Sequence, residues 1–251
     1  MGQLNGKVAI ITGAGSGFGE GMAEGYIREG AKVIIADLNA VAGERVAQAL
    51  GAHAKAVTCD VANADSVNAM VKACVDTFGV PDIVINNAGT THKNQPMLDV
   101  DEKTFDRVFD INVKSIYFMT HAVVPLMRKR GQGGVIINVG STAGIRPRPG
   151  LSWYNASKGA VNLLSRAMAV ELAPDKIRVN ALCPVMGATG LLGDFMGIPD
   201  TPENRAKFIS TIPLGRFCEP RDMAAAAIFL GTDAAEFLTG LEMPVDGGRT
   251  I

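Results

Sequence analysis

Short, largely apolar runs recur along the chain and alternate with longer stretches of mixed polarity. The runs cover residues 8–11, 33–36, 54–57, 83–85, 135–139 and 177–182, and most are rich in Val and Ile. Because most of them are apolar at consecutive positions rather than at alternate ones, they predict strands that are buried on both faces. That pattern is typical of a parallel sheet covered by helices on each side.

The stretches between these runs have apolar residues at helical spacing. They predict helices over residues 18–29, 41–50, 65–78, 101–130, 153–172 and 222–230. Regular alternation of strand and helix indicates an α/β fold, a Rossmann-like, doubly wound parallel sheet with helices on both faces. The chain has 251 residues and shows no Ser/Gly-rich linker and no repeat, so we expect one domain over residues 1–251.

One segment, residues 186–213, interrupts this alternation. It carries four glycines and three prolines around an apolar patch. Long irregular inserts in compact domains are usually functional, so we expect a substrate lid here. The alternative is a surface excursion that packs its own apolar residues together.

Composition and charge narrow the classes of function. Hydrophobic residues make up 47%, charged residues 20%, and the net charge is −1, so we expect neither a nucleic acid nor a membrane as partner. No apolar run approaches the ~20 residues of a membrane span, and the first seven residues lack an apolar signal core, which favours a cytoplasmic location. The cysteines form no CxxC pair and the histidines are dispersed, so we expect neither disulfides nor a metal site.

A glycine-rich turn follows the first predicted strand and contains Gly13, Gly15, Gly17 and Gly19. Glycine lets the backbone approach a pyrophosphate without an intervening Cβ, and the N–H groups at the start of the following helix point toward the anion. Such a run is weak evidence by itself, but its place between a strand and a helix is the context of a dinucleotide site.

The second predicted strand ends at Asp37. A carboxylate at this place can accept hydrogen bonds from the adenosine ribose and repels the 2′-phosphate of NADP. Neither residues 14–16 nor Leu38 supplies a Lys or Arg that would offset this repulsion. We therefore expect NAD as the cofactor, while a plain loop or helix-capping carboxylate is the alternative for Asp37.

Tyr154 and Lys158 lie four residues apart, on one face of a predicted helix. A free tyrosine has a pKa near ~10, and a cation within several ångströms lowers a pKa by about 1–3 units, so Lys158 is expected to make the phenol a usable acid/base. Ser141 follows the strand at 135–139, where its hydroxyl can hold a substrate oxygen. A Tyr/Lys pair alone means little; Ser141 and a nucleotide fold make it informative.

These residues resemble the motifs of the short-chain dehydrogenase/reductase family, and the resemblance extends over the whole chain. The matching motifs are Thr12-Gly13-x-x-x-Gly17-x-Gly19, Asp60-Val61, Asn86-Asn87-Ala88-Gly89, Asn112, Ser141, Tyr154-x-x-x-Lys158 and Val245-Asp246-Gly247-Gly248. Together they are highly specific.

The resemblance implies roles for individual residues. Tyr154 exchanges the proton, Lys158 also holds the ribose hydroxyls, Ser141 orients the carbonyl and Asn112 supports a proton-relay water. For the cofactor, the implied and motif-based contacts are Gly13, Ser16, Gly17, Phe18, Gly19, Asp37, Leu38, Asp60, Val61, Asn87, Ala88, Gly89, Tyr154, Lys158, Pro184, Val185 and Thr189. Ordinary buried amides remain the alternative for Asn87 and Asn112. The family often has Pro-Gly where this chain has Pro184-Val185, so the nicotinamide corner is narrower.

Family members usually form tetramers, so the resemblance also implies a homotetramer. For the substrate we expect contacts from Ser141, His92, Arg148, Met186 and Leu191. Arg146, Arg148 and Lys93 suit a carboxylate or sulfonate, although solvated loop charges are the commoner reading.

The resulting hypothesis is an NAD-dependent oxidoreductase that interconverts a secondary alcohol and a ketone, such as a small hydroxy or keto compound, a sugar or a hydroxy acid. One alternative is a reductase of 3-oxoacyl thioesters, in which Arg128, Lys129 and Arg130 meet an acidic carrier protein. A more distant alternative is a non-catalytic nucleotide sensor, which would bind cofactor without turnover.

Overall fold

The computed structural model describes residues 2–187 and 190–251. Its seven strands form one sheet in the order β3-β2-β1-β4-β5-β6-β7, and all neighbouring pairs are parallel. The strands are β1 (Val8–Thr12), β2 (Lys32–Asp37), β3 (Ala54–Thr58), β4 (Ile83–Asn86), β5 (Gly134–Val139), β6 (Ile177–Pro184) and β7 (Glu242–Val245). The doubly wound parallel sheet expected from the sequence is confirmed.

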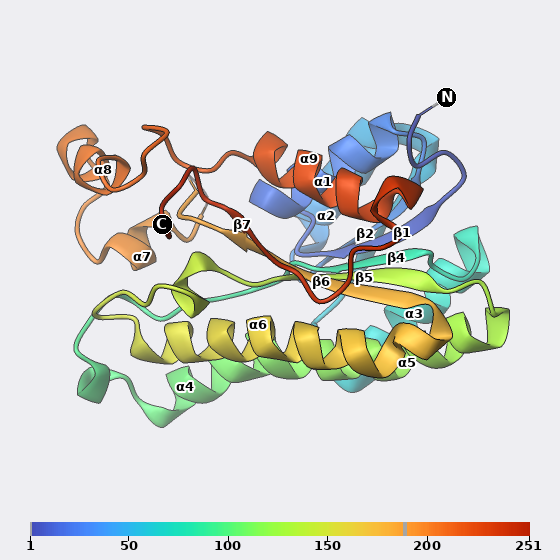
Figure 1. Ribbon diagram of the computed structural model, residues 1–251, viewed down its shortest axis with the longest axis horizontal. Coiled ribbons are helices and arrows are strands. Elements are labelled where there is room, and N and C mark those ends of the chain that lie inside the picture. Colours follow the sequence, from blue (N-terminus) through green and yellow to red (C-terminus); the bar gives the residue numbers. More distant parts are fainter. Residues whose placement is uncertain (1, 188–189) are drawn as a thin grey trace.

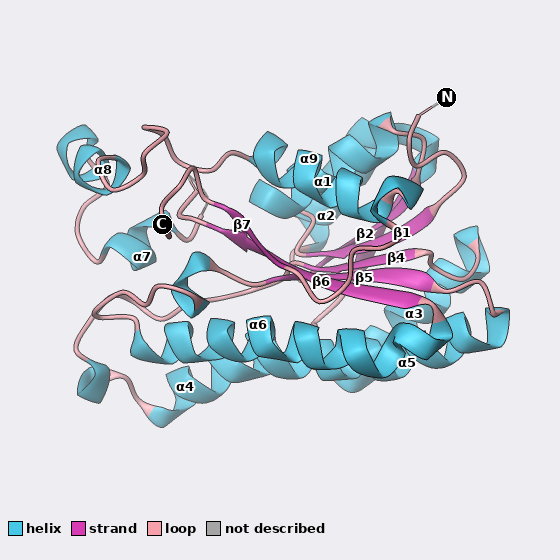
Figure 2. Cartoon of the chain, viewed as in Figure 1, coloured by secondary structure: helices cyan, strands magenta, loops and turns pink. Residues whose placement is uncertain are grey.

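Helices cover both faces of this sheet (Figure 1, Figure 2). On one face lie α1 (Gly17–Arg28), α2 (Ala40–Leu50) and α9 (Pro220–Gly231). On the other lie α3 (Ala64–Phe78), α4 (Glu102–Phe109), α5 (Ser115–Arg130) and α6 (Ser152–Leu172). No helix in the described part of the chain is both long and apolar enough to span a bilayer.

Alternate residues of β1 pack into two different cores. Ile11 packs among Met22 and Tyr26 of α1, whereas Ile10 packs with Met70 of α3 and Met127 of α5. All of these side chains are fully buried. A strand that must fill a core on each face needs consecutive apolar residues, which is the pattern seen in the sequence.

The sheet order places a crevice above the carboxyl ends of β1 and β4. The chain winds outward from β1 to β2 and β3, then returns to the other side of β1 to form β4. In open parallel sheets, ligands bind at the strand carboxyl ends where the winding direction reverses. The glycine-rich turn after β1 and the loop after β4 therefore lie at the same edge.

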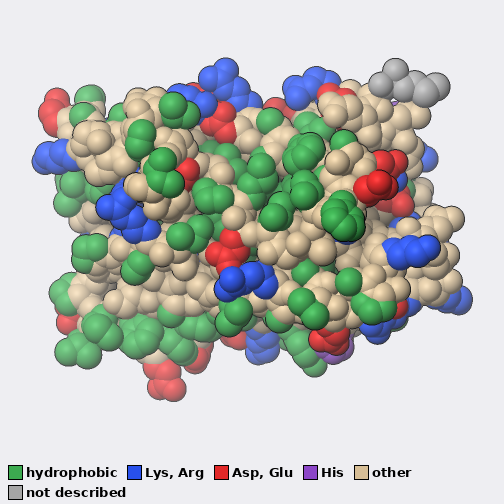
Figure 3. All heavy atoms as spheres, viewed as in Figure 1, with side chains coloured by type: hydrophobic (Ala, Val, Ile, Leu, Met, Phe, Trp, Pro, Cys, Tyr) green, Lys and Arg blue, Asp and Glu red, His purple; other side chains and the backbone are tan. Residues whose placement is uncertain are grey.

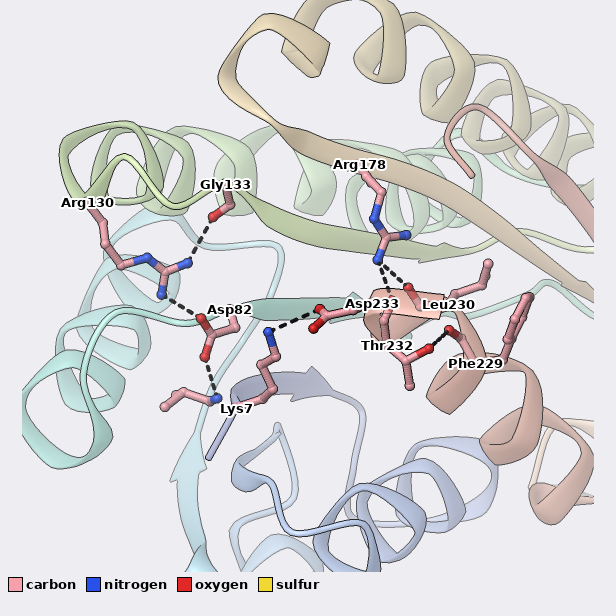
Figure 4. A network of polar contacts seen from close by, with 10 residues as sticks. Lys7, Asp82, Arg130, Gly133, Arg178, Phe229, Leu230, Thr232 and Asp233 are labelled. Atoms are coloured by element: carbon pink, nitrogen blue, oxygen red, sulfur yellow. Dashed lines mark hydrogen bonds and ion pairs between the residues drawn. The ribbon is translucent and has the colours of Figure 1, made fainter. Parts of the chain in front are cut away.

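A polar network joins helix ends to the amino ends of the strands, on the opposite side of the sheet from this crevice (Figure 4). Arg130, at the end of α5, pairs with Asp82 at 2.8 Å, and the same carboxylate accepts the Val8 N–H at 2.8 Å. Arg178 of β6 donates to the carbonyl oxygens of Leu230 and Thr232. Arg130 and Arg178 therefore stabilise the ends of helices and the amino ends of strands, far from the crevice.

Three sequence expectations differ from the structure. The strand β7 was not expected, because it is short and contains Pro244, which an edge strand tolerates. Residues 186–213 are not wholly irregular, since they contain α7 (Leu192–Met196) and α8 (Pro202–Ile209). The helix expected over 101–130 is divided into α4 and α5 by a π-helical turn, η3 (Asp110–Lys114).

Candidate active site

A cavity of about 800 Å³ runs along the carboxyl ends of the strands. It is lined by most of the described residues that the sequence singled out: Gly13, Ser16, Gly17, Phe18, Asp37, Leu38, Asp60, Val61, Asn87, Ala88, Gly89, Ser141, Arg148, Tyr154, Lys158, Pro184, Val185, Met186 and Leu191. Three expected site residues, Gly19, Asn112 and His92, lie behind the lining. Thr189 lies outside the described residues.

At Gly13 the glycine-rich turn comes too close to the loop after β4 for a side chain. Gly13 has a positive φ of 62°, and a Cβ there would lie 3.0 Å from the Cα of Ala88. A Cβ on Gly19 would lie against the Gly13 carbonyl oxygen, so Gly19 permits packing and does not contact the cavity. Ser16 makes no capping hydrogen bond in the described structure, so the first N–H groups of α1 are left for an anion. This cradle fits a pyrophosphate.

Asp37 holds the turn and also faces the cavity. Its Oδ2 accepts the Gly15 N–H at 2.7 Å, and its Oδ1 accepts the Asn39 N–H at 2.8 Å. Asp37 is therefore a loop carboxylate, as the alternative interpretation predicted. Each of its oxygens keeps a lone pair for a further donor, so the expected contact with a ribose stays a prediction.

The structure brings a cation to this turn that sequence inspection missed. Arg45 of α2 donates to the Gly15 carbonyl oxygen at 3.0 Å and to both carboxylate oxygens of Glu20 at 2.8 and 2.9 Å. Because Glu20 engages this guanidinium in a two-pronged ion pair, Arg45 is not free to offset the charge of Asp37. Spacing along the chain gives no signal of this contact.

Asn87 joins the turn after β1 to the loop after β4. Its Nδ2 donates to the carbonyl oxygens of Thr12 and Gly13, while the Thr12 hydroxyl accepts the N–H groups of Asn87 and Ala88. The amide therefore satisfies backbone groups, as the simpler interpretation predicted, and it lines the cavity as well.

Tyr154, Lys158 and Ser141 meet in the cavity. Tyr154 and Lys158 lie one turn apart on α6, and Ser141 begins the short helix after β5. The Lys158 Nζ donates to the Val139 carbonyl oxygen at 2.7 Å. That contact leaves two of its three N–H groups for a ligand. The phenol, the ammonium and the hydroxyl thus face one space, as the sequence predicts.

The electrostatics of Tyr154 differ from the expectation. Burial raises the pKa of its phenol to about 12, and the groups that act in the opposite direction are first the Ser141 hydroxyl and then the Arg148 guanidinium. Burial also lowers the pKa of the Lys158 ammonium to about 8. Lys158 is not among the groups that lower the pKa of Tyr154 in this structure, and its Nζ donates to the Val139 carbonyl oxygen.

Asn112 lies in the π-helical turn between α4 and α5. Its Oδ1 accepts the Thr90 N–H at 2.8 Å, and its Nδ2 donates to the Thr90 carbonyl oxygen and to the Ser157 hydroxyl, each at 2.9 Å. The extra residue of such a turn re-aims the side chains around it, which is frequent at functional sites. Asn112 therefore ties the loop after β4 to α6 beside Tyr154.

Two residues behind the cavity, His92 and Asn94, form hydrogen bonds to segments that line it. His92 is buried, and its Nε2 accepts the Tyr154 N–H at 3.4 Å instead of facing substrate space. Asn94, which sequence reasoning missed, donates to the carbonyl oxygens of Pro149 and Phe195. It fits closely under Gly150, where a Cβ would collide with its side chain. Asn94 thus joins the segment with Arg148 to the expected lid.

The part of the cavity beyond Tyr154 is lined by aromatic and basic side chains. The Phe195 ring of α7 packs edge-on against the Tyr154 ring at 5.0 Å. The Arg148 guanidinium lies 5.0 Å from the centre of the Phe208 ring of α8. Lys207 and Arg249, which sequence reasoning also missed, lie on the same lining. Only tertiary structure brings these positions together.

Comparisons with known proteins agree with this geometry. Residues 13–250 match the family model described as Enoyl-(Acyl carrier protein) reductase. The 4-formylbenzenesulfonate dehydrogenase of Comamonas testosteroni is 47% identical over 99% of this chain and 100% of its own length. The galactitol 2-dehydrogenase of Agrobacterium fabrum is 37% identical over 98% of each.

A solved structure is similarly close. The 3-ketoacyl-(acyl-carrier-protein) reductase of Brucella melitensis, complexed with NADH, superposes with a TM-score of 0.94 at 48% identity and covers 99% of this chain and 100% of its own. Sequence motifs, fold and relatives therefore lead to one conclusion. The chain belongs to the short-chain dehydrogenase/reductase family.

Proposed function

We propose that the protein is an NAD(H)-dependent oxidoreductase that interconverts a secondary alcohol and a ketone, with Tyr154 as the acid/base. The observation that carries this proposal is the meeting of the Tyr154 phenol, the Ser141 hydroxyl and the Lys158 ammonium in one cavity with the glycine-rich turn. Relatives named as dehydrogenases of secondary alcohols, such as galactitol 2-dehydrogenase, support the reaction class.

The cofactor end of the cavity fits NAD. The turn between β1 and α1 would hold the pyrophosphate, Asp37 would accept the adenosine ribose hydroxyls, and Asp60 and Val61 would border the adenine. The two remaining N–H groups of Lys158 would hold the second ribose beside Ala88 and Gly89. Pro184, Val185 and Tyr154 would border the nicotinamide; Thr189, proposed for its carboxamide, lies outside the described residues. The NADH complex of the similar Brucella protein supports this assignment.

When bound, NAD(H) would supply the hydride acceptor for oxidation or the hydride donor for reduction. In the oxidative direction, the alcohol carbon loses a hydride and its oxygen loses a proton to Tyr154, which leaves a ketone. Ser141 holds the substrate oxygen beside the phenol, since its side chain lines the same cavity and acts to lower the pKa of Tyr154. Asn112 supports a relay water that returns the proton to solvent. In the reductive direction, Tyr154 donates the proton to the forming alkoxide.

We propose further that residues 1–251 act as one domain and that residues 186–213 act as its substrate lid. Phe195 of this segment already packs on the Tyr154 ring. The protein is expected to be a cytoplasmic homotetramer: its four cysteines are free and buried, and α6 exposes Leu163 and Val170. Light scattering in solution tests the oligomeric state.

Replacing Tyr154 tests the proposed acid/base. We expect Tyr154→Phe to lower kcat by about 100- to 10,000-fold, because the hydride step then lacks its proton donor. The measurement is NADH absorbance at 340 nm with a panel of ketones, together with a fluorescence titration of NADH. Near-normal turnover in a variant that binds NADH tightly would refute the assignment.

Reduction of 3-oxoacyl thioesters is a second candidate, favoured by the name of the similar Brucella structure. The structure removes the argument from Arg128, Lys129 and Arg130 for a carrier protein. Arg128 is paired with Asp175 and Arg130 with Asp82. The three basic residues end α5 at the amino ends of the strands, on the opposite side of the molecule from the cavity. A carrier docked there could not deliver a thioester to Tyr154.

A further inference from the structure

The substrate end of the cavity has an uneven distribution of charge. Arg146, Arg148, Lys207 and Arg249 line it. Among the described lining residues the carboxylates are Asp37 and Asp60, and both belong to the cofactor end. In the space-filling view, Lys and Arg side chains lie beside α8 and the C-terminus, at this end of the molecule (Figure 3).

These cations contact only neutral groups within the described ranges. The Arg146 Nη1 donates to the Arg249 carbonyl oxygen at 2.9 Å, and the Lys207 Nζ donates to the Asn204 side chain at 3.1 Å. Several arginines elsewhere are paired with carboxylates, as Arg216 is with Asp222 at 2.6 Å. The cavity therefore presents positive charge that protein groups do not neutralise.

Arg148 is the member of this group that lies deepest. It is half-buried, its Nη2 is 3.5 Å from the Phe195 carbonyl oxygen, and its guanidinium packs on the Phe208 ring. Burial lowers the pKa of Arg148, and the nearby charge of Arg249 acts in the same direction. Burying a charged guanidinium in this way costs free energy unless an anion pairs with it.

Apolar side chains surround these charges on the path to the phenol. Leu151, Leu191, Phe195, Ile212 and Phe217 line the same cavity. A ligand that satisfies both features has an apolar or aromatic body, with an anionic group at one end and the reacting carbon at the other. A guanidinium suits carboxylate and sulfonate equally, since both offer two oxygens in one plane to its N–H groups.

We propose that the substrate is a secondary alcohol or ketone that carries a carboxylate or sulfonate on an apolar body, and that Arg148, supported by Arg146 and Arg249, binds the anionic group. The proposal rests on the proposed oxidoreductase function and names its substrate class. Arg148 then sets the distance between the anion and the carbon that faces Tyr154.

Matched ketones test this selectivity. The probes are 4-acetylbenzoate, 4-acetylbenzenesulfonate and the neutral 4-acetylbenzamide, each reduced with NADH. We expect the wild-type kcat/KM to favour the anionic ketones by at least about tenfold, and Arg148→Gln to reduce that preference by about 10- to 100-fold, as loss of a charged hydrogen-bonding partner implies. The carboxylate and sulfonate arms show which anion is preferred.

Three variants control the interpretation. Arg28→Gln removes an exposed arginine at the end of α1 and should keep the anion preference. Arg148→Lys retains the charge and should keep part of it, and Arg249→Gln tests the second cation should Arg148→Gln fail to bind NADH. An equal kcat/KM for the three ketones in the wild type, or an unchanged preference in both Gln variants at Arg148 and Arg249, would overturn the proposal.

A binding measurement separates this inference from the proposed function. Calorimetric titration of benzoate, benzenesulfonate and benzamide into the protein–NADH complex needs no turnover. If the two anions bind more tightly than benzamide, and if Arg148→Gln weakens their binding, the anion site is supported even where the proposed oxidoreductase function fails. Turnover of ketones without any preference for anions, in kinetics and in binding, overturns the anion site alone.

Discussion

At the scale of single residues, the site depends on a phenol that the fold makes less acidic. Tyr154 is almost fully buried, and burial raises its pKa to about 12. Ser141 and Arg148 oppose this effect but do not cancel it. In the absence of ligand, the residue is therefore a stable proton donor near neutral pH and a base only in a small fraction of molecules.

This pKa predicts a different pH dependence for each direction. Oxidation needs the phenolate, whose fraction grows about tenfold per pH unit below the pKa, so kcat/KM for an alcohol should rise steadily from pH 6 to pH 9 or so. Reduction needs the protonated phenol and should stay nearly flat over that range. Steady-state kinetics in both directions measure the two profiles.

Cofactor affinity is the control for these profiles. NADH and NAD titrations across the same pH series show whether binding accounts for any slope. An oxidation rate that is independent of pH, with saturating cofactor, would contradict a high phenol pKa in the reacting complex.

At the scale of elements, the end of β2 and the turn before α1 act as one unit. Asp37 accepts the Gly15 N–H, and the close approach at Gly15, where a Cβ would lie 2.8 Å from the same carboxylate oxygen, leaves no room for a side chain. Arg45 adds a second tie from α2, and Glu20 keeps its charge neutralised. Asp37, the residue proposed to select NAD, therefore also fixes the geometry of the turn.

Asp37→Asn removes the negative charge and keeps one of the two acceptors. The amide oxygen can still accept the Gly15 N–H, whereas the Asn39 N–H loses its acceptor. Two unit charges about 4 Å apart repel by several kcal/mol at a protein surface, so we expect the ratio of kcat/KM for NAD over NADP to fall by at least about tenfold. Steady-state kinetics with each cofactor measure the ratio.

Glu44→Gln, an exposed change on the same face of the molecule, is the matched control and should leave this ratio unchanged. A wild-type protein that prefers NADP, or an Asp37→Asn variant with the original ratio, would remove Asp37 from this role.

At the scale of the whole molecule, contacts between segments distant in sequence hold the layers together. The Tyr26 hydroxyl of α1 donates to the Ala227 carbonyl oxygen of α9 at 2.8 Å, and both residues are fully buried. This hydrogen bond joins helices from the two ends of the chain, which lie on the same face of the sheet as α2 (Figure 1).

Tyr26→Phe should lower the free energy of unfolding by about 1 kcal/mol, because it removes one buried hydrogen bond and keeps the ring. Urea denaturation followed by circular dichroism measures the change. Tyr117→Phe, at a ring that is 56% exposed, is the matched control and should change the free energy by less than about 0.5 kcal/mol. Equal effects in the two variants would show that the α1–α9 hydrogen bond adds nothing.

Local sequence determined the elements and the chemistry that spacing can carry. Consecutive apolar residues specify strands buried on both faces, which made most of the strands and the parallel sheet predictable. The edge strand β3, with Lys55 inside its run, was predicted as well but is only partly buried. The turn at Gly13–Gly19 and the pair Tyr154/Lys158 were also readable, because helix and turn geometry place residues a few positions apart. The edge strand β7, which is short and interrupted by Pro244, lacks this signal and was missed.

Tertiary structure alone decided what surrounds that chemistry. Burial, a property of the whole fold, has the largest effect on the pKa of Tyr154, and the Lys158 ammonium donates to the Val139 carbonyl oxygen, a contact that spacing did not predict. The partnership of Arg45 with Glu20, the support from Asn94, and the assembly of Arg148, Lys207 and Arg249 join segments far apart in sequence. No local pattern encodes such distances, because they are fixed only when the layers pack.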